Sequence, residues 1–212
     1  MAPEADDGAP AVRTVRPFGR RGLMVDLEAP ADVHRLRRVV EAAGRAVEIV
    51  PGWCTLLVRT EEDPGPIADW LRRVELAEGE QVSDVELVEI EVVYDGPDLE
   101  DVAKHVDRSA DEVVKLHTRP EYTVVMLGFS RGFPYLAGMD ETLAGLSRLD
   151  TPRKKVPAGS VGIALDQTGI YPKTSPGGWR LLGRTDVTLF DPDRWPPSLL
   201  EPGGTVRFKA VG

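Results

Sequence analysis

The side chains best able to do chemistry gather between residues 117 and 179, and a histidine opens that region. His117 directly precedes an apolar run, whereas His34 and His105 stand among charged residues at helical spacing, where a solvated surface position is expected. Two interpretations of His117 stay open. Its imidazole would lie beside the loop that follows the apolar run, or it would interact with the dipole at a helix end.

A basic cluster, formed by Arg153, Lys154 and Lys155, follows in a chain that has 26 Lys and Arg against 35 Asp and Glu. Solvated loop charges are the usual explanation for such a cluster. The alternative is an anion site, in which guanidinium and ammonium groups meet a carboxylate or phosphate over nearby backbone amides.

Glycines then alternate with apolar β-formers, and six of the 21 glycines fall between Gly159 and Gly183. Glycine permits positive φ and close backbone approach, so this mixture predicts short strands around a shaped site or interface. Aromatic residues recur nearby at non-helical spacing, namely Phe129, Phe133, Tyr135 and Trp179. Each one is most simply a core residue, but together they favour a pocket or an interface.

The pattern G-x-S-x-G at residues 128–132 formally matches the nucleophile elbow of serine hydrolases. That fold requires a histidine after the serine, yet all three histidines precede Ser130. We therefore interpret the pattern as a turn that leaves a strand. The sequence contains no P-loop, H-E-x-x-H or C-x-x-C motif, so any nucleotide handled by this protein is not held by a P-loop.

Composition narrows the class of protein. The net charge of −9 argues against nucleic acid and anionic membranes as general partners. Cys54 is the single cysteine, which excludes an internal disulfide and a cysteine metal cluster and favours a cytoplasmic location. Residues 1–10 are acidic and rich in Pro and Ala, unlike a signal peptide, and predict a disordered tail. No apolar run approaches the ~18 residues needed to cross a bilayer.

The first half of the chain alternates strand and helix patterns. Apolar runs predict strands over 23–27, 47–50, 54–58 and 85–93, and helical spacing predicts helices over 30–44 and 64–77. The resulting β-α-β-β-α-β order is the split arrangement of ferredoxin-like domains. The turn Asp95-Gly96-Pro97 marks the expected boundary, so residues 11–94 are assigned to this domain.

Residues 95–212 have a different pattern of predicted elements from the first half of the chain. Two short helices are predicted over 99–106 and 110–116, and a capping box from Ser109 to Glu112 opens the second. A strand over 121–127 follows, and short strands separated by Gly and Pro continue to 205–210, which predicts a small β-barrel or sandwich. The expected fold class is therefore α+β.

Three segments identify a family. Residues 116–139 read LHTRPEYTVVMLGFSRGFPYLAGM, residues 151–185 read TPRKKVPAGSVGIALDQTGIYPKTSPGGWRLLGRT, and residues 189–192 read LFDP. They resemble the allophanate hydrolase subunit 1 family, which includes the B subunit of prokaryotic ATP-dependent 5-oxoprolinase and the sporulation histidine-kinase inhibitor. The resemblance covers nearly the whole chain. It departs from the family at Arg131, where proline is usual, and at residues 164–166, where a glycine pair is usual.

The resemblance implies an N-terminal ferredoxin-like domain followed by a cyclophilin-like β-barrel. It also implies a subunit 2 partner of related barrel fold, which is the C subunit in 5-oxoprolinase, and in that enzyme a third component, the A subunit. The implied activity is hydrolysis of a cyclic amide: 5-oxoproline, ATP and water give glutamate, ADP and phosphate, with ATP as the co-substrate of the complex. No metal is implied.

Site residues follow from the same resemblance. The implied polar residues are His117, Arg153, Gln167 and Tyr171. The implied substrate-binding residues are Gly128, Phe129, Phe133, Tyr135, Gly159, Ser160, Gly177, Gly178 and Trp179. Chemically, Arg153 could neutralise a carboxylate or phosphoryl group and His117 could move a proton near neutral pH, while Gln167 and Tyr171 could orient a lactam or carbonyl.

Two other functions remain as alternatives. One is a carboxyltransferase subunit of a urea carboxylase or allophanate hydrolase type of system, for which biotin would be the cofactor on a partner. The other is a binding module without catalysis that inhibits a sensor histidine kinase.

Overall fold

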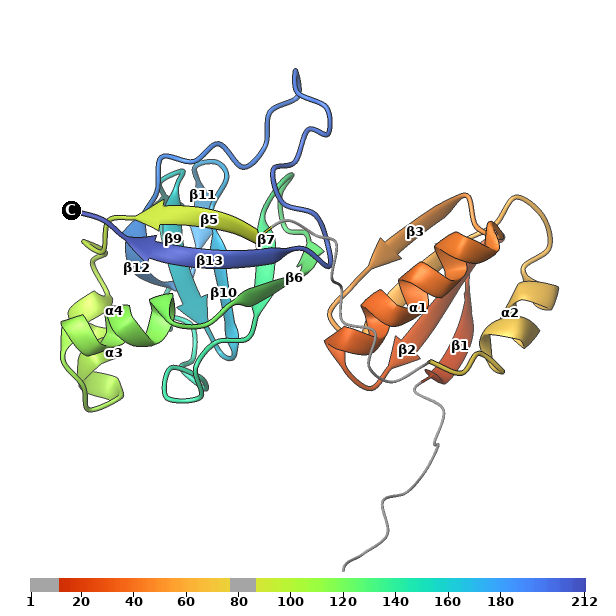
Figure 1. Cartoon of the computed structure of the whole chain (residues 1–212), viewed down its shortest axis with the longest axis horizontal. Coiled ribbons are helices and arrows are strands. Elements are labelled where there is room, and N and C mark those ends of the chain that lie inside the picture. The colour runs from red at the N-terminus through yellow and green to blue at the C-terminus, as the bar shows by residue number, and fades with distance from the viewer. Residues whose placement is uncertain (1–11, 77–86) are drawn as a thin grey trace, which may run out of the picture. The chain divides into compact units, whose positions relative to one another are not determined.

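The computed structural model describes residues 12–76 and 87–212, which fall into two compact units, Met1–Ser83 and Asp84–Gly212. Figure 1 shows both units, each built around its own sheet. The predicted disordered tail, residues 1–10, lies outside the described residues.

The first unit is a four-stranded antiparallel sheet in the order β1-β2-β4-β3, with two helices. Its elements are β1 (Val12–Phe18), β2 (Gly22–Leu27), α1 (Pro30–Ala43), β3 (Glu48–Pro51), β4 (Thr55–Arg59) and α2 (Gly65–Leu71). The core lies where alternate residues of β2 and β4 meet the apolar side of α1. Since strand side chains alternate in direction, these two strands bury every second residue.

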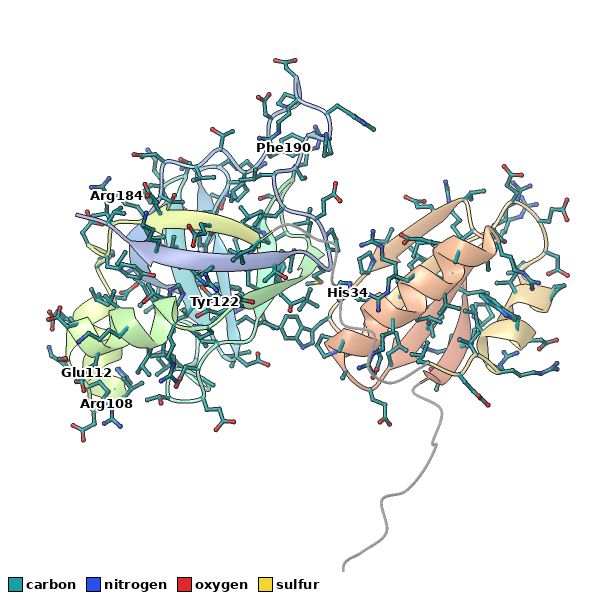
Figure 2. All side chains as sticks on the ribbon, in the orientation of Figure 1. His34, Arg108, Glu112, Tyr122, Arg184 and Phe190 are labelled. Atoms are coloured by element: carbon teal, nitrogen blue, oxygen red, sulfur yellow. The ribbon has the colours of Figure 1, made fainter. Side chains whose placement is uncertain are left out.

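Helix α1 begins and ends as the sequence predicts, with Pro30 in its first turn and Gly44 in the left-handed region at φ 61°. The expected surface position of His34 is wrong, because the residue is only 5% exposed and is one of the buried residues of this helix. Burial, followed by the charges of Arg37 and Arg38, lowers the pKa of His34 to about 4. Figure 2 shows His34 on this helix.

The expected last strand of the first unit, residues 85–93, belongs to the second sheet instead. Its described part is β5 (Leu87–Val92), which pairs in parallel with β13 (Thr205–Ala210) along all six residues. The boundary expected at Asp95 therefore lies too late in the chain, since the units divide between Ser83 and Asp84. In the first sheet β1 takes the edge beside β2, so the ferredoxin-like strand arrangement is completed from the N-terminal side.

The second unit is a sheet of seven strands in the order β12-β9-β10-β7-β6-β13-β5. The strands not yet given are β6 (Tyr122–Leu127), β7 (Pro134–Ala137), β9 (Ser160–Ala164), β10 (Gln167–Ile170) and β12 (Arg180–Arg184). Val93, just beyond β5, exchanges two backbone hydrogen bonds of 2.9 Å with Arg184 at the end of β12. Because these bonds join the two edges of the sheet, the sheet is a nearly closed barrel.

Two helices cover one end of this barrel, α3 (Leu99–His105) and α4 (Ala110–Thr118), which lie together in Figure 1. The predicted capping box is confirmed, because Ser109 and Glu112 each bond the other's backbone amide. Buried residues of both helices pack with Ile163 and Leu182 of the barrel. None of the described helices is long and apolar enough to cross a membrane.

Candidate functional site

Five aromatic rings form one connected group in the second unit, which we call the aromatic cluster: Phe129, Phe133, Tyr135, Tyr171 and Trp179. Phe133 lies at its centre, with ring centroids 5.2 Å from Tyr171 and 5.5 Å from Trp179 in nearly perpendicular geometry. Such edge-to-face contacts are the favoured arrangement of aromatic pairs. The structure thus brings together the five aromatic side chains that the resemblance implies for a site.

The loop from Gly128 to Gly132 carries the exposed member of the cluster. Phe129 has a left-handed φ of 58° and is 63% exposed, while its ring contacts Phe133 and Tyr171. The amide of Gly128 donates to the Phe133 carbonyl at 3.1 Å, and the Phe133 amide donates to the Ser130 carbonyl at 3.0 Å. The G-x-S-x-G pattern is therefore a tight turn between two strands, as interpreted from the sequence.

Two glycines lie where the aromatic rings leave no room for a side chain. A Cβ on Gly177 would overlap the Tyr171 hydroxyl, and a Cβ on Gly169 would lie 2.7 Å from the Pro134 carbonyl oxygen. The neighbouring Gly178 differs, because a Cβ there would meet its nearest atom at an ordinary 3.6 Å. Gly177 is thus required by the ring beside it, whereas Gly178 is not.

Arg153 lies next to Gly177 across a two-stranded ribbon of β8 (Arg153–Val156) and β11 (Ser175–Gly177). Its Nη2 donates to Asp98 Oδ1 at 2.7 Å, and Asp98 Oδ2 accepts from the Leu181 amide at 2.7 Å. The Nη1 atom is buried and has no hydrogen-bond partner among the described residues. A fixed guanidinium with a spare donor is suited to a carboxylate or phosphate. Asp98, which orients Arg153, was missed in the sequence because it lies 55 residues away.

The two tyrosines of the cluster share a cationic neighbour. Burial raises the pKa of Tyr171, opposed by the Trp179 backbone and by the charges of Arg148 and Arg153. Burial also raises the pKa of Tyr135, again opposed by Arg148. Both phenols therefore stay protonated at neutral pH and can donate hydrogen bonds. Arg148 is a second residue that sequence reasoning missed, since it lies in an irregular segment without a motif.

His117 is fully buried. It belongs to a hydrogen-bonded group of Tyr94, His117, Thr168 and the Gly162 carbonyl, which we call the histidine network. Nδ1 lies 2.7 Å from the Tyr94 hydroxyl and Nε2 lies 2.9 Å from Thr168 Oγ1. Thr168 donates its own proton to the Gly162 carbonyl at 3.1 Å, so it accepts from Nε2–H and Tyr94 donates to Nδ1. The ring also stacks on Phe208 with centroids 4.6 Å apart.

Burial lowers the pKa of His117 to about 3. The imidazole is thus neutral near pH 7, and both of its nitrogens already have partners. Tyr122, labelled in Figure 2, donates to the His117 carbonyl at 2.8 Å and encloses the residue further. Neither interpretation left open by the sequence describes this position: His117 joins a core network rather than a loop site or a helix dipole.

Three further predicted residues lie in the hairpin of β9 and β10 or in the turn before it. Gln167 is half-buried at the start of β10, opposite Ala164. The Gly159 amide donates to the Tyr171 carbonyl at 2.7 Å, and the Ser160 amide donates to the Pro157 carbonyl at 3.3 Å. These amides are occupied, so this turn does not offer them to an anion. Within residues 12–76 and 87–212, no group of three or more His, Cys, Asp or Glu side chains could hold a metal ion.

Comparison with known proteins identifies relatives of this chain by sequence and by fold. Residues 13–200 match the family described as the carboxyltransferase domain, subdomain C and D. The B subunit of 5-oxoprolinase from Escherichia coli O157:H7 is 41% identical over 207 residues, which cover 90% of this chain and 93% of that protein. The match thus spans almost the full length of both proteins.

Solved structures agree with this assignment. The crystal structure of TTHA0988 superposes with a TM-score of 0.75 and 36% identity, covering 91% of this chain and 40% of that one. The urea carboxylase of Kluyveromyces lactis has a TM-score of 0.71 at 21% identity, covering 100% of this chain and 23% of that one. At that identity the likeness shows the fold alone. In both cases the matched fold is one part of a longer polypeptide.

Proposed function

The chain belongs to the family of the carboxyltransferase domain, subdomain C and D, and from this premise we propose that it is the B subunit of a 5-oxoprolinase-like complex. The observation that carries the proposal is the 41% identity to a 5-oxoprolinase B subunit over 93% of that protein's length. The proposed partners are a subunit 2 protein, similar to the C subunit of 5-oxoprolinase, and a protein similar to its A subunit. We also propose that this protein is located in the cytoplasm.

The geometry around Arg153 supports a small cyclic substrate with a carboxylate. The unpaired Nη1 would bind the carboxylate, because Asp98 already fixes the other side of the guanidinium. The aromatic cluster would pack against the five-membered ring, and the protonated Tyr171 hydroxyl would donate to the lactam carbonyl oxygen. His117 takes no proton in this proposal, since its nitrogens are engaged in the core.

The reaction consumes two water molecules. One adds to the lactam carbonyl carbon as the ring C–N bond breaks and the nitrogen takes up a proton, which gives glutamate; the other is consumed when ATP becomes ADP and phosphate. The described residues do not fit a nucleotide phosphate site at the glycine turn, because the Gly159 and Ser160 amides bond backbone carbonyls. ATP is therefore proposed to bind another component of the complex.

The test is glutamate formation from 5-oxoproline and ATP by this chain alone and by the purified complex with both proposed partners. We expect glutamate only from the full complex, and a loss of turnover in a complex that carries Arg153→Ala. An Arg153→Ala complex with unchanged turnover would remove Arg153 from the site. A stable complex that forms no glutamate would contradict the proposed substrate.

The second candidate, a carboxyltransferase subunit, is supported by the description of the matched family. Under this alternative a biotinylated partner carries the carboxyl group to urea or a similar amide. Streptavidin blotting of the purified complex separates the two proposals. A biotinylated polypeptide in the complex would favour carboxyl transfer, and glutamate formation without one would favour lactam hydrolysis.

A further inference from the structure

A loop projects from the barrel between β12 and β13, and residues 190–198 of it form what we call the projecting loop. Figures 1 and 2 show this segment standing away from the strands, with Phe190 labelled at its base. Phe190 and Ser198 form a bridge across its base. Inside it the Asp191 amide donates to the Pro197 carbonyl at 2.8 Å, and the Asp193 amide donates to Asp191 Oδ1 at 3.0 Å.

Trp195 lies within this loop with 92% of its surface exposed. The loop is held instead by its neighbour Arg194, whose Nε and Nη2 donate to the carbonyls of Pro196 and Pro197 at 3.3 and 3.2 Å. A large indole is thus presented to solvent on a segment that hydrogen bonds already order. Ordered, exposed tryptophans of this kind are typical of the residues that dominate protein interfaces, because little entropy is lost when they are buried.

The base of the projecting loop packs directly on the turn of the candidate site. Gly132 has a φ of 77°, and a Cβ on it would lie 2.7 Å from Phe190 Cβ. Leu189, just before Phe190, is 2% exposed and belongs to the barrel core. The turn that carries Phe129 and the loop that carries Trp195 are therefore neighbours, and a polypeptide bound at the loop would approach the aromatic cluster.

We propose that the projecting loop docks the subunit 2 protein, with Trp195 inserted into an apolar pocket of that partner. This inference rests on the proposed function for the identity of the partner. The similar chains TTHA0988 and urea carboxylase continue well beyond this fold, so its relatives occur joined to further polypeptide. The pocket must contain an acceptor for the indole N–H, and a basic rim would complement exposed Asp193 and the chain's net charge of −9.

The experiment is calorimetric titration of the full chain with purified subunit 2 protein from the same genome. Trp195→Ala is expected to raise Kd at least ~30-fold, as for an interface hot spot. Arg194→Ala, which loosens the loop but keeps the indole, is expected to raise it about 5-fold. The matched control is Phe18→Ala, another exposed aromatic at 55%, which lies in the first unit and is expected to leave Kd unchanged.

Trp195→Ala removes a side chain that is almost fully solvated, so its thermal unfolding should match that of the wild type. Equal Kd values for Trp195→Ala and the wild type would overturn the inference, as would failure of the wild type to bind subunit 2. The proposed function fails separately: a complex whose Kd depends on Trp195 but which forms no glutamate would keep the docking loop and remove the 5-oxoprolinase assignment.

Discussion

The histidine network and the Arg153 side of the aromatic cluster lie in the same barrel and contain residues of similar chemistry, yet they differ in how their polar atoms are satisfied. In the histidine network each imidazole nitrogen has a partner, and the chain of donors ends at the Gly162 carbonyl. Beside the aromatic cluster, Arg153 is held by Asp98 on one side and keeps a buried Nη1 without a partner among the described residues.

The role of a buried polar residue depends on whether its donors and acceptors already have partners. A network in which every donor and acceptor has a partner stabilises the fold and has no free donor for a substrate. A buried donor left unpaired carries a free-energy cost, which a ligand can recover when it binds. We therefore expect His117 to contribute to stability and propose Arg153 as a binding residue, and substitutions that separate these two properties test both roles.

The largest expected effect is on stability at His117. His117→Ala would leave the Tyr94 and Thr168 hydroxyls without their partner and open a cavity beside Phe208. We expect the free energy of unfolding to fall by about 4 kcal/mol. Urea denaturation of the purified chain measures it, and a fall of less than about 1 kcal/mol would contradict the closed network.

The pH dependence of stability gives the next effect. His117 has a pKa lowered to about 3 in the folded protein, while a histidine in the unfolded chain titrates near ~6.5. The unfolded state alone binds this proton between those values, so stability is full above pH ~6.5 and is lost as pH falls toward about 3.

The expected loss is about 1.4 kcal/mol per pH unit below pH ~6. His34 has the same sign of shift and stays in both proteins, so the difference between wild type and His117→Gln isolates His117. Unfolding free energies of the two proteins from about pH 6 to about pH 4 should converge as the pH falls. A difference that stays constant over this range would mean that His117 is not buried as a neutral ring.

The third effect concerns binding at Arg153. Arg153→Lys keeps the positive charge but loses the planar fork that bonds Asp98 and that we propose also binds the substrate carboxylate. We expect kcat/KM of the complex to fall about 100-fold while unfolding changes little, with steady-state glutamate formation as the measurement. Exposed Lys154 provides the matched control, because Lys154→Ala should turn over like the wild type. Equal losses in both variants would mean that the fall is not specific to the guanidinium of Arg153.

The smallest effect separates two adjacent glycines. Gly177→Ala places a methyl group against the Tyr171 hydroxyl, whereas Gly178→Ala has ordinary space around it. Displacement of the hydroxyl should lower kcat/KM about 10-fold in the first variant, and the second should stay within about 2-fold of the wild type. If both variants behaved alike in steady-state glutamate formation, the position of Tyr171 would not matter to turnover.

Much of the fold follows from local patterns in the sequence. The predictions of helix α1 and of the capping box at Ser109 are confirmed. Each depends on residues close to a helix end, namely Pro30 and Gly44 for α1 and the Ser109–Glu112 pair for the capping box. The placement of β5 was wrong because its alternating residues fit either sheet, and its partner β13 lies at the other end of the chain. Short-range patterns do not specify which distant strand will pair.

The residues of the candidate site also fall into those that local sequence patterns indicated and those that they did not. Aromatic and glycine residues in neighbouring segments indicated a cluster, and the structure brings those rings together. Asp98 and Arg148 were missed because their roles depend on contacts across the barrel, which no spacing in the sequence reveals. The proton-transfer role expected for His117 did not take account of Tyr94 and Thr168, since residue type alone does not indicate that these two hydroxyls lie against the ring nitrogens.

The parallel pairing of β5 with β13 has a consequence for synthesis on the ribosome. Glu91 and Lys209 form an ion pair across these strands although 118 residues separate them, and β13 lies between β5 and β6. The first sheet has all its strands by Arg59, so it can fold while translation continues. The barrel cannot form completely until residues 205–210 have been synthesised, because β13 is the shared neighbour of β5 and β6. Until then these two strands have an unpaired edge, so we expect this unit to be more prone to misfolding than the first.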